Sequence, residues 1–337
     1  METHWHYQVY GQRLCSSRPL RELPRFSFES RDVAFRYLPP GEALDIPWQD
    51  CRLLTRRPTT LECDLSLYWT GAGFLLRWEG QCDFLVSEDG RYIQCQPSSD
   101  TQVMWTEGTL YNMILSFALF LRGVSNFHAS AVALPDGAVG FMADPGSGKS
   151  SLAAGFTGAG FPFLTDDVLA VQEDSGAFLG YPGYPHVSLS CHSLDGLFGS
   201  ISRPPVEFSN GEKERIALAD LGASFSSQPV PLKALFILRR ASDGRAICLE
   251  RLPRIAAVQG LLEHTNCLPL LPREVLQPHL NFIERLTAAV PVYYLHYPSG
   301  LENVPRVIGA ITQEVRWLPD PAELAEYPVG TGKASQP

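Results

Sequence analysis

The sequence predicts an α/β fold in which a β-rich N-terminal part precedes a layer of alternating strands and helices. The first hundred residues consist of short runs of aromatic and branched side chains separated by Gly, Pro, Asp and Asn, which is typical of strands and turns. From Phe127 onwards, apolar strand-like runs alternate with helix-like segments, as in an α/β layer. One almost wholly apolar segment, residues 107–123, separates the two parts.

Composition limits the class of protein. The chain has 337 residues, of which 45% are hydrophobic and 19% charged, so we expect a folded chain with room for two domains. The net charge is −9 and the arginines are dispersed, which argues against binding to nucleic acid. The N-terminus has no signal-like pattern, and no apolar run reaches the roughly 18 residues of a membrane span. We therefore expect a cytoplasmic protein. The eight cysteines form no C-x-x-C pair, so free thiols are the simplest interpretation.

The N-terminal domain is expected over residues 1–106, and its strands should form an antiparallel sheet. These strands are expected at residues 7–16, 31–39, 73–80 and 82–97. The last of them contains Asp89-Gly90, the signature of a tight hairpin turn. The apolar segment 107–123 then predicts a buried connecting helix that is short for a membrane span and ends at a capping glycine, Gly123.

The second domain is expected over residues 124–326, followed by a loose tail at 327–337 that contains Lys333. A strand, a turn and a second strand are predicted over 127–145, a helix from about Lys149 to Thr157, and a strand pair over 161–174. Further strands are predicted at 232–240 and 291–298, and further helices at 254–265, 281–290 and 304–315.

The stretch ADPGSGKS, Ala143 to Ser150, matches a phosphate-binding loop except that alanine replaces the first glycine. Small residues let backbone N–H groups close around phosphate oxygens at a helix N-terminus, where the helix dipole favours anions. Lys149 would then reach the β- and γ-phosphates, and the Ser150 hydroxyl would bind Mg²⁺. The candidate nucleotide-binding residues are Asp144, Pro145, Gly146, Ser147, Gly148, Lys149, Ser150 and Ser151. An ordinary Gly/Ser turn is the alternative. It is disfavoured by the strand before the loop, the helix after it and the rarity of lysine, which occurs only at 149, 213, 233 and 333.

Two adjacent carboxylates, Asp166 and Asp167, end the next predicted strand. Ligands gather at strand ends of open α/β sheets, so one aspartate is a candidate Mg²⁺ ligand and the other a base. Neighbouring residues of an extended strand point to opposite faces, and both could face the nucleotide only if the strand ends in a turn there. A surface turn is the alternative for this pair. His128 precedes the loop by one strand and is a second catalytic candidate, although a lone histidine in an apolar strand is often a core residue.

These residues resemble a known family. The run FHASAVALPDGAVGFMADPGSGKSSLAAGFTGAGFPFLTDDVLAV, residues 127–171, is similar to the catalytic core of HPr kinase/phosphorylase and its relatives. The likeness is greatest to HPr kinase-like proteins encoded with lasso-peptide and other peptide-modifying gene clusters. It extends to residues 7–23, 182–189, 211–218 and 288–305, and so covers most of the chain.

The resemblance implies a P-loop core of the HPr kinase-like (PEP carboxykinase-like) type that uses ATP and Mg²⁺. It implies that Asp166 is the base towards a substrate hydroxyl with His128 near it, that Lys149 holds ATP, and that Ser150 and Asp167 hold Mg²⁺. The Glu-Arg-Gly motif of true HPr kinases has no counterpart here, because GYPGYPHVSLSCHSLDG stands in its place. The lack of this motif argues against HPr as the substrate and leaves the reverse phosphorolysis open.

Other positive residues are weaker candidates. Lys213 and Arg215 resemble a family segment that approaches the phosphates, and a solvated turn is the alternative. Arg239 and Arg240 end the strand at 232–240 and could clamp a phosphate, although a solvent-facing strand end is the simpler interpretation.

Three functions fit the sequence. The first is an ATP-dependent serine kinase that phosphorylates a hydroxyl of a peptide or small protein, with homo-oligomers possible because relatives form them. The second is a P-loop ATPase or nucleotide switch. The third is a leader-peptide-binding module of a peptide-modification pathway, in which the loop survives as an anion site. We favour the kinase, because the aspartate pair and His128 suit an alcohol nucleophile.

Overall fold

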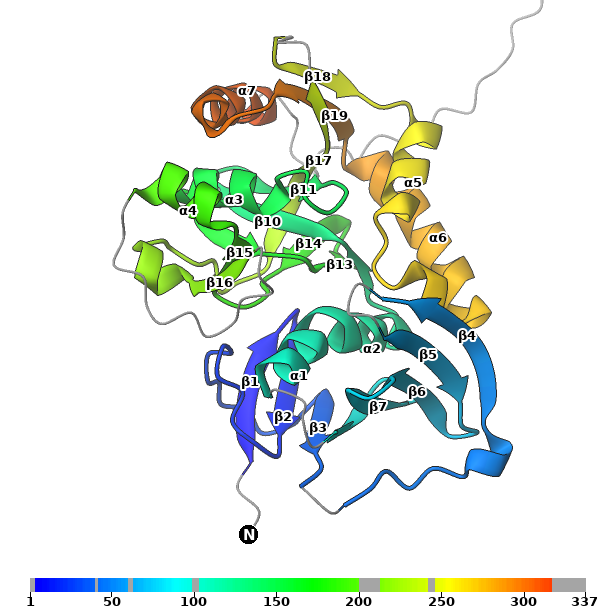
Figure 1. The fold of residues 1–337 in the computed structure, drawn as a ribbon. Helices are drawn as coiled ribbons and strands as arrows, with labels where there is room; N and C mark the ends of the chain where they lie inside the picture. The colour runs from blue at the N-terminus through cyan, green and yellow to red at the C-terminus, as the bar shows by residue number, and fades with distance from the viewer. Residues whose placement is uncertain are drawn as a thin grey trace, which may run out of the picture.

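The chain is seen in a computed structural model that describes residues 4–39, 42–59, 63–98, 103–199, 213–241 and 246–316. Within these residues it is a mixed α/β structure with an eight-stranded sheet, a nine-stranded sheet and a two-stranded sheet (Figure 1). The α/β class predicted from the sequence is confirmed. The expected tail at 327–337 lies outside the described residues.

The eight-stranded sheet comprises the N-terminal part. Its strands are β1 Trp5–Val9, β2 Gln12–Ser16, β3 Val33–Tyr37, β4 Arg52–Pro58, β5 Asp64–Trp69, β6 Gly73–Trp78, β7 Cys82–Ser87 and β8 Tyr92–Pro97. Their order across the sheet is β1-β2-β3-β8-β7-β6-β5-β4. The predicted hairpin at Asp89-Gly90 is confirmed, because β7 and β8 pair antiparallel. The prediction of a wholly antiparallel sheet is wrong: β3 pairs parallel with both β2 and β8, since long connections rather than hairpins join it to them.

The apolar segment forms one nearly continuous helix across the concave side of this sheet (Figure 1). It consists of α1 Val103–Thr109, a π-helical segment Leu110–Ile114 and α2 Leu115–Leu121. The helix thus begins before the predicted Glu107. Its side chains share a hydrophobic cluster with the sheet, and the rings of Phe117 and Phe74 lie 5.4 Å apart. Burial on all sides explains why the segment is apolar all round.

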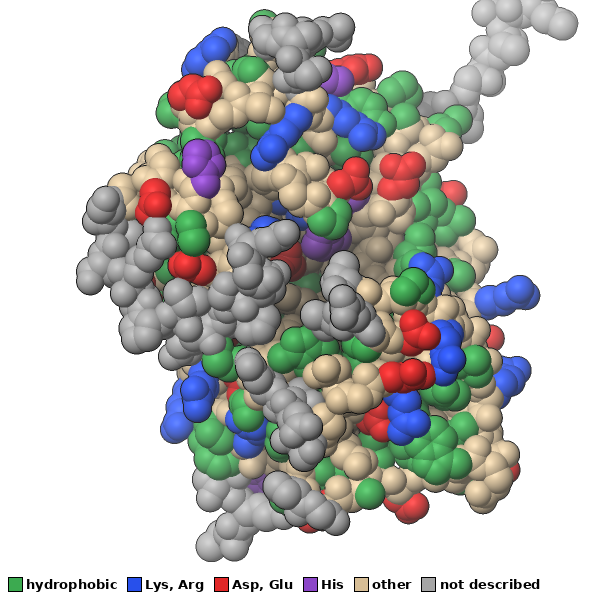
Figure 2. Space-filling model, in the orientation of Figure 1, with side chains coloured by type: hydrophobic (Ala, Val, Ile, Leu, Met, Phe, Trp, Pro, Cys, Tyr) green, Lys and Arg blue, Asp and Glu red, His purple; other side chains and the backbone are tan. Residues whose placement is uncertain are grey.

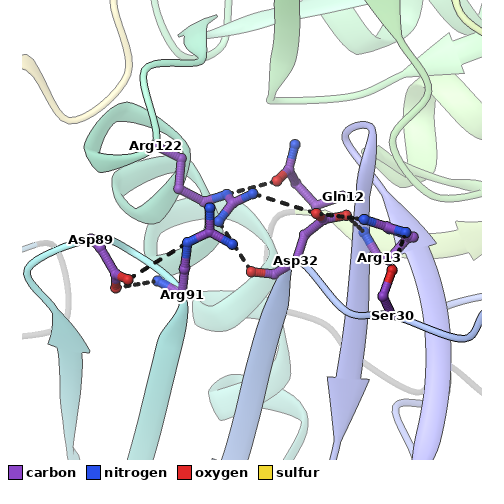
Figure 3. A network of polar contacts seen from close by, with 7 residues as sticks. All are labelled: Gln12, Arg13, Ser30, Asp32, Asp89, Arg91 and Arg122. Carbon is purple, nitrogen blue, oxygen red and sulfur yellow. Dashed lines mark hydrogen bonds and ion pairs between the residues drawn. The ribbon is translucent and has the colours of Figure 1, made fainter.

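A polar network holds the C-terminal end of this helix to the first strands (Figure 3). Arg122 donates hydrogen bonds to the side chain of Gln12 (2.8 Å) and to the backbone carbonyl of Asp32 (3.1 Å). Arg13 binds the Asp32 carboxylate with two nitrogens at 2.7 and 3.0 Å, and it also contacts Ser30. Bidentate pairs of this kind fix orientation, so the helix end and the β1–β3 edge form one unit.

The nine-stranded sheet and its helices form the second part. Its strands are β9 Ser125–Phe127, β10 Ala129–Leu134, β11 Gly137–Met142, β12 Phe163–Thr165, β13 Leu169–Asp174, β14 Ala177–Tyr181, β17 Val230–Ala241, β18 Cys248–Arg251 and β19 Val292–Pro298. The helices are α3 Lys149–Gly158, α4 Cys191–Phe198, α5 Arg254–Glu263, α6 Arg273–Ala289 and α7 Val304–Arg316. The small sheet pairs β15 His186–Leu189 with β16 Glu214–Ala217. Short 3₁₀ segments are Trp48–Asp50, Leu218–Leu221, Leu268–Leu270 and Leu301–Asn303.

Helices cover both faces of the central strands, which gives a three-layer arrangement. On one face, Val139 and Phe141 of β11 belong to a hydrophobic cluster with α3, α4 and α7. On the other face, Ala138 and Met142 belong to a cluster with α5 and α6. This alternation follows from the two-residue period of a strand, and it explains why the strand sequence is apolar throughout.

The strand directions bring several segments to one edge of the sheet. Strand β10 is antiparallel to both β11 and β12, so the C-terminal ends of β11 and β12 and the N-terminal end of β10 lie together. Strand β17 runs parallel to β11, and β19 runs parallel to β17. The C-terminal ends of these three strands therefore lie at the same edge. Ligand sites of open α/β sheets lie at such an edge.

The two parts meet closely beside this edge. The turn between β1 and β2 docks on the second part, where the Tyr10 N–H donates to the Pro182 carbonyl at 2.8 Å and Gly11 lies against the ring of Tyr181. Glu22 and Arg215 form a buried ion pair across the same junction, with 3.0 Å between their nearest atoms. The N-terminal part is therefore packed on the domain that carries the loop.

Candidate functional site

The glycine-rich loop, residues 143–148, joins the end of β11 to the start of α3. Gly146 and Gly148 have φ of +81° and +97°, which other residues adopt only with strain. The N-cap residue of α3 is Gly148, which has no side chain, so within the described residues no N-cap side chain competes with an anion for the first N–H groups of the helix. Ala143 does not have a positive φ, and it is buried in the core. The backbone at position 143, where the sequence departs from the motif, therefore does not require glycine.

Lys149 begins α3 and is buried, with 6% of its surface exposed. Its Nζ donates to the Ala143 carbonyl at 3.0 Å and contacts Nε2 of His128 at 2.9 Å. Burial lowers the pKa of Lys149, and the charges of Asp167 and Asp166 oppose that shift. Among the described residues no carboxylate lies within ion-pair distance of Nζ. A buried cation whose contacts are neutral suits an incoming polyphosphate.

His128 occupies the bend between β9 and β10. Burial first, and then the charge of Lys149, lowers the pKa of His128 to about 4. The imidazole is therefore neutral at pH 7, and Nε2 accepts the hydrogen bond from the Lys149 ammonium. The structure thus places this predicted catalytic residue in direct contact with the loop lysine.

Asp166 and Asp167 lie in a tight turn between β12 and β13. The Thr165 hydroxyl donates to the Val168 carbonyl at 2.7 Å, and the Val168 N–H donates to the Asp166 carbonyl at 2.7 Å. Asp167 has φ of +62°, a left-handed conformation that is unusual for a residue with a side chain. The strand alternation considered in the sequence therefore does not apply, because neither aspartate is part of an extended strand.

Asp166 is buried and accepts three hydrogen bonds. Oδ1 accepts from the hydroxyls of Ser130 (2.5 Å) and Ser150 (3.0 Å), and Oδ2 accepts from the Ser188 N–H (3.1 Å). Burial and the neighbouring charge of Asp167 raise the pKa of Asp166, and the hydrogen bonds from Ser130, Ser188 and Ser150 act against that rise. The contact with Ser150 links the aspartate turn directly to the glycine-rich loop and its helix.

Asp167 is half-buried, and its carboxylate has no hydrogen-bond donor in the described part of the chain. Its backbone carbonyl accepts from Asn266 at 3.4 Å. The predicted Ser150–Asp167 pair is therefore not in contact, whereas Ser150 and Asp166 are. Two adjacent carboxylates thus differ in burial and bonding, as groups with different roles do.

The residues at this edge fit Mg²⁺ bound with a nucleotide. Within the described ranges no three His, Cys, Asp or Glu side chains are close enough to hold a metal ion by themselves. Mg²⁺ in such sites is held by one or two protein oxygens together with phosphates and water. Ser150 and Asp166 supply such oxygens next to the uncapped helix N-terminus. The donor set is thus suited to a metal that arrives with phosphate.

Lys213 and Arg215 occupy different surroundings. The charge of Lys213 helps to lower the pKa of both His128 and Lys149, which places Lys213 near the site. Arg215 forms the ion pair with Glu22 and lies against Gly108 of α1. Arg215 therefore holds the two parts of the molecule together, in addition to any contact with substrate.

The ends of β17 and β19 bring two further groups to the loop. Arg240 and Tyr297 are partners across these strands. The Tyr297 hydroxyl donates to the Ser147 carbonyl at 3.0 Å, and the Arg240 guanidinium lies against Gly148. Arg239 points elsewhere and stacks on Tyr294, 4.8 Å from the ring centroid. The two arginines, equivalent in the sequence, thus differ in the fold.

Sequence reasoning missed Ser130, Ser188 and Tyr297 as parts of this site. Ser130 follows His128 by two positions, and that spacing on a strand signals a shared face. Ser188 takes part through its backbone N–H, which no side-chain pattern can reveal. Tyr297 depends on the pairing of β17 with β19, which joins segments distant in the sequence.

The space-filling view shows a recess near the centre of the molecule, where histidine, basic and acidic side chains lie together (Figure 2). Elsewhere on this face charged side chains of both signs are interspersed. None of the helices in the part of the chain that the structure describes is long and apolar enough to cross a membrane.

Comparison with known proteins gives little further information. No protein-family model matches the chain, and no curated protein matches it. Among solved structures, the HPr(Ser) kinase/phosphatase from Coxiella burnetii is similar over 57% of this chain and 95% of its own, with 14% sequence identity and a TM-score of 0.30. That likeness is too low to carry an argument, so the function is argued from the site itself.

Proposed function

We propose that this protein is an ATP-dependent kinase that transfers the γ-phosphoryl group of Mg-ATP to a hydroxyl group. The observation that carries the proposal is the contact between Ser150, at the start of α3, and Asp166 of the neighbouring turn. It brings the N-terminus of α3 and two adjacent carboxylates to one edge of the sheet. Phosphoryl transfer requires phosphate binding, charge neutralisation and an oriented nucleophile, and this edge carries a group suited to each.

The loop and Lys149 would hold the nucleotide. The N–H groups at the uncapped start of α3 would bind phosphate oxygens, with Asp144 to Ser151 forming the cradle. Lys149 would turn from the Ala143 carbonyl and His128 to the β- and γ-phosphates. Exchanging two neutral partners for an anion favours that movement, since charged hydrogen bonds are the stronger ones.

The two aspartates would divide the remaining roles. We assign the metal position to Ser150 and Asp166, because these two are already in contact, and the base to Asp167, whose carboxylate is half-buried and has no donor in the described part of the chain. This assignment is the reverse of the one that the family resemblance implies. Mg²⁺, when bound, would neutralise negative charge on the phosphates. Asp167 would accept the proton of the acceptor hydroxyl as that oxygen attacks.

His128 would act by orienting the Lys149 side chain. It is neutral at pH 7 and contacts Lys149, so it can hold the lysine ready without adding a positive charge to the pocket. It would release the lysine when the nucleotide binds. His128 is therefore better suited to orienting Lys149 than to removing a proton from the acceptor.

The acceptor we propose is a serine hydroxyl of a peptide or small protein, as in a pathway that tailors a lasso peptide or another ribosomally made peptide. The support for this class is the sequence resemblance, together with the absence of the motif that accompanies HPr as substrate. We also propose that the protein forms a homo-oligomer.

The decisive experiment incubates the purified protein with Mg-ATP and the peptides encoded beside its gene. Mass spectrometry then tests for one added phosphoryl group and locates it, with Lys149→Met as the control. If ATP is consumed but no peptide is phosphorylated, the protein is an ATPase or nucleotide switch and not a kinase. If the protein binds a peptide but consumes no ATP, it is a leader-peptide-binding module.

A further inference from the structure

A cavity of about 140 Å³ opens beside the glycine-rich loop. Its walls come from the starts of α3, α4 and α7, the end of β19 and the 3₁₀ segment Leu301–Asn303, and they include Ser151, His192, Tyr297, Leu301 and Val304. The volume is several times the ~30 Å³ that one water molecule occupies in the liquid. The walls combine apolar side chains with a few hydroxyls, as small-molecule sites do.

The cavity and the aspartates lie on different faces of α3. Ser151 and Leu152 of α3 line the cavity together with Gly148, the residue that precedes the helix. Ser150 is two residues from Leu152, which turns it about 200° around the helix axis, and it contacts Asp166. A chain of phosphates lying on the loop would therefore have one end at Asp166 and the other at the cavity.

Arg240 is one of the residues that line this cavity. A Cβ atom on Gly148 would lie 2.7 Å from its Nη2 atom, so the guanidinium lies directly against the loop. Arg240 is exposed, and no ion pair or hydrogen bond joins it to the described part of the chain. A guanidinium in this state is free to bind phosphate oxygens, for which its planar donors are well suited.

We propose that this cavity is the nucleoside subsite of the nucleotide site, and that Arg240 binds the phosphate nearest the nucleoside. The proposal rests on the proposed function, because it takes the glycine-rich loop to hold a nucleoside triphosphate. Lys149 and Ser150 mark the β,γ end of the phosphates. The α-phosphate and the nucleoside then leave the loop on the opposite side, at Arg240 and the cavity.

The cavity walls suit the two chemical parts of a nucleoside. Leu301 and Val304 present apolar surface to the face of a base. The hydroxyls of Ser151 and Ser193 lie 2.9 Å apart and can exchange their mutual hydrogen bond for one to a ribose hydroxyl. His192 also lines the cavity and is the side chain there with ring nitrogens that could contact the edge of a base.

Arg239 provides a matched control for Arg240. The two residues are adjacent on β17, but Arg239 stacks on Tyr294 instead of facing the loop. Dissociation constants for Mg-ATP and for inorganic tripolyphosphate would be measured by calorimetry for the wild type, Arg240→Gln and Arg239→Gln. We expect Arg240→Gln to weaken Mg-ATP binding about tenfold, as expected for loss of one charged hydrogen-bonding partner, and Arg239→Gln to change it less than twofold.

A second variant tests the cavity itself. Leu301→Trp fills it from a wall that does not touch the phosphates, so we expect much weaker Mg-ATP binding with unchanged tripolyphosphate binding. If the wild type binds ATP and tripolyphosphate equally well and Leu301→Trp changes neither affinity, the cavity is not a nucleoside subsite. The loop would then remain a phosphate site. Failure of the wild type to bind either ligand would instead overturn the proposed function. Unchanged ATP binding in Arg240→Gln would remove Arg240 from the site.

Discussion

The hydroxyl of Ser150 donates a 3.0 Å hydrogen bond to Oδ1 of Asp166, and Asp167 next to it takes no part in that contact. This asymmetry predicts different consequences for the two amide variants. Asp166→Asn should abolish the Mg²⁺ dependence of ATP binding, because it removes charge from the metal position. Asp167→Asn should retain Mg-ATP binding and lower phosphoryl transfer by about 10²- to 10⁴-fold, the usual contribution of a general base.

Nucleotide affinity with and without Mg²⁺, measured beside the rate of peptide phosphorylation, distinguishes the two roles. If Asp167→Asn loses the metal dependence and Asp166→Asn keeps it, the roles are exchanged and the assignment implied by the sequence resemblance holds. Ser188→Ala is the matched control, because Ser188 contacts Asp166 through its backbone N–H alone and its side chain is not required.

Lys149→Met should reduce phosphoryl transfer without destabilising the fold. The buried ammonium contacts only a carbonyl and a neutral imidazole, so its removal leaves no unpaired carboxylate behind. We expect the rate of phosphoryl transfer to fall by at least about 10²-fold, as when one charge-stabilising donor is lost, and the melting temperature to stay the same or rise. A large drop in melting temperature would show that Lys149 stabilises the fold.

The arrangement of the loop and the aspartate turn could be predicted because each is a local motif at the end of a strand. Lys149 and Asp166 are brought together because β11 and β12 both pair with β10, and consecutive elements usually lie next to each other in space. The separate surroundings of Asp166 and Asp167 could not be predicted. They depend on the left-handed conformation of Asp167 and on Ser130 and Ser188, which come from other strands.

The arginines at the end of β17 illustrate the same limit. From the sequence, Arg239 and Arg240 form one basic strand end. Neighbouring residues of a strand point to opposite faces, and the pairing of β17 with β19 places Arg240 opposite Tyr297. Only that long-range register decides which arginine reaches the loop. The parallel pairings of β3 escaped prediction for a similar reason, since nothing local specifies them.

The ion pair between Glu22 and Arg215 predicts strong coupling between the two parts of the molecule. Both side chains are buried, with exposures of 10% and 7%. Arg215→Met should lower the free energy of unfolding by about 3–5 kcal/mol, because it removes one member of a buried ion pair. The double variant Glu22→Leu/Arg215→Met should recover much of this loss. Urea unfolding of the two variants tests the coupling, and equal losses in both would argue against it.

Tyr10 carries a buried hydroxyl that has no hydrogen-bond partner among the described residues. Tyr10→Phe removes an unsatisfied polar group, so we expect the free energy of unfolding to stay the same or to rise by up to about 1 kcal/mol. Tyr184→Phe is the control, because its hydroxyl donates to Asn112 at 3.3 Å, and it should be destabilising by about 1 kcal/mol. A loss in Tyr10→Phe as large as in the control would mean that the Tyr10 hydroxyl is bonded in solution.

His279 of α6 predicts that the protein loses stability in mild acid. The Thr265 hydroxyl donates to the Leu261 carbonyl at 3.0 Å, so it accepts from His279 Nε2–H at 2.9 Å, and Nδ1 then accepts from the Ser125 hydroxyl at 2.9 Å. The ring is therefore held neutral. Burial lowers the pKa of His279 from 6.5 to about 4.

Between these two pH values the unfolded chain binds more protons than the folded one, so the free energy of unfolding must decrease as the pH falls from about 6.5 towards 4. His279→Gln keeps a donor and an acceptor but does not titrate. It should reduce the slope of unfolding free energy against pH by up to one proton equivalent, or about 1.4 kcal/mol per pH unit. Urea unfolding of both proteins between pH 5 and 7 measures the two slopes. An unchanged slope in His279→Gln would show that His279 titrates alike in the folded and unfolded chains, and the other buried histidines would then account for the acid sensitivity.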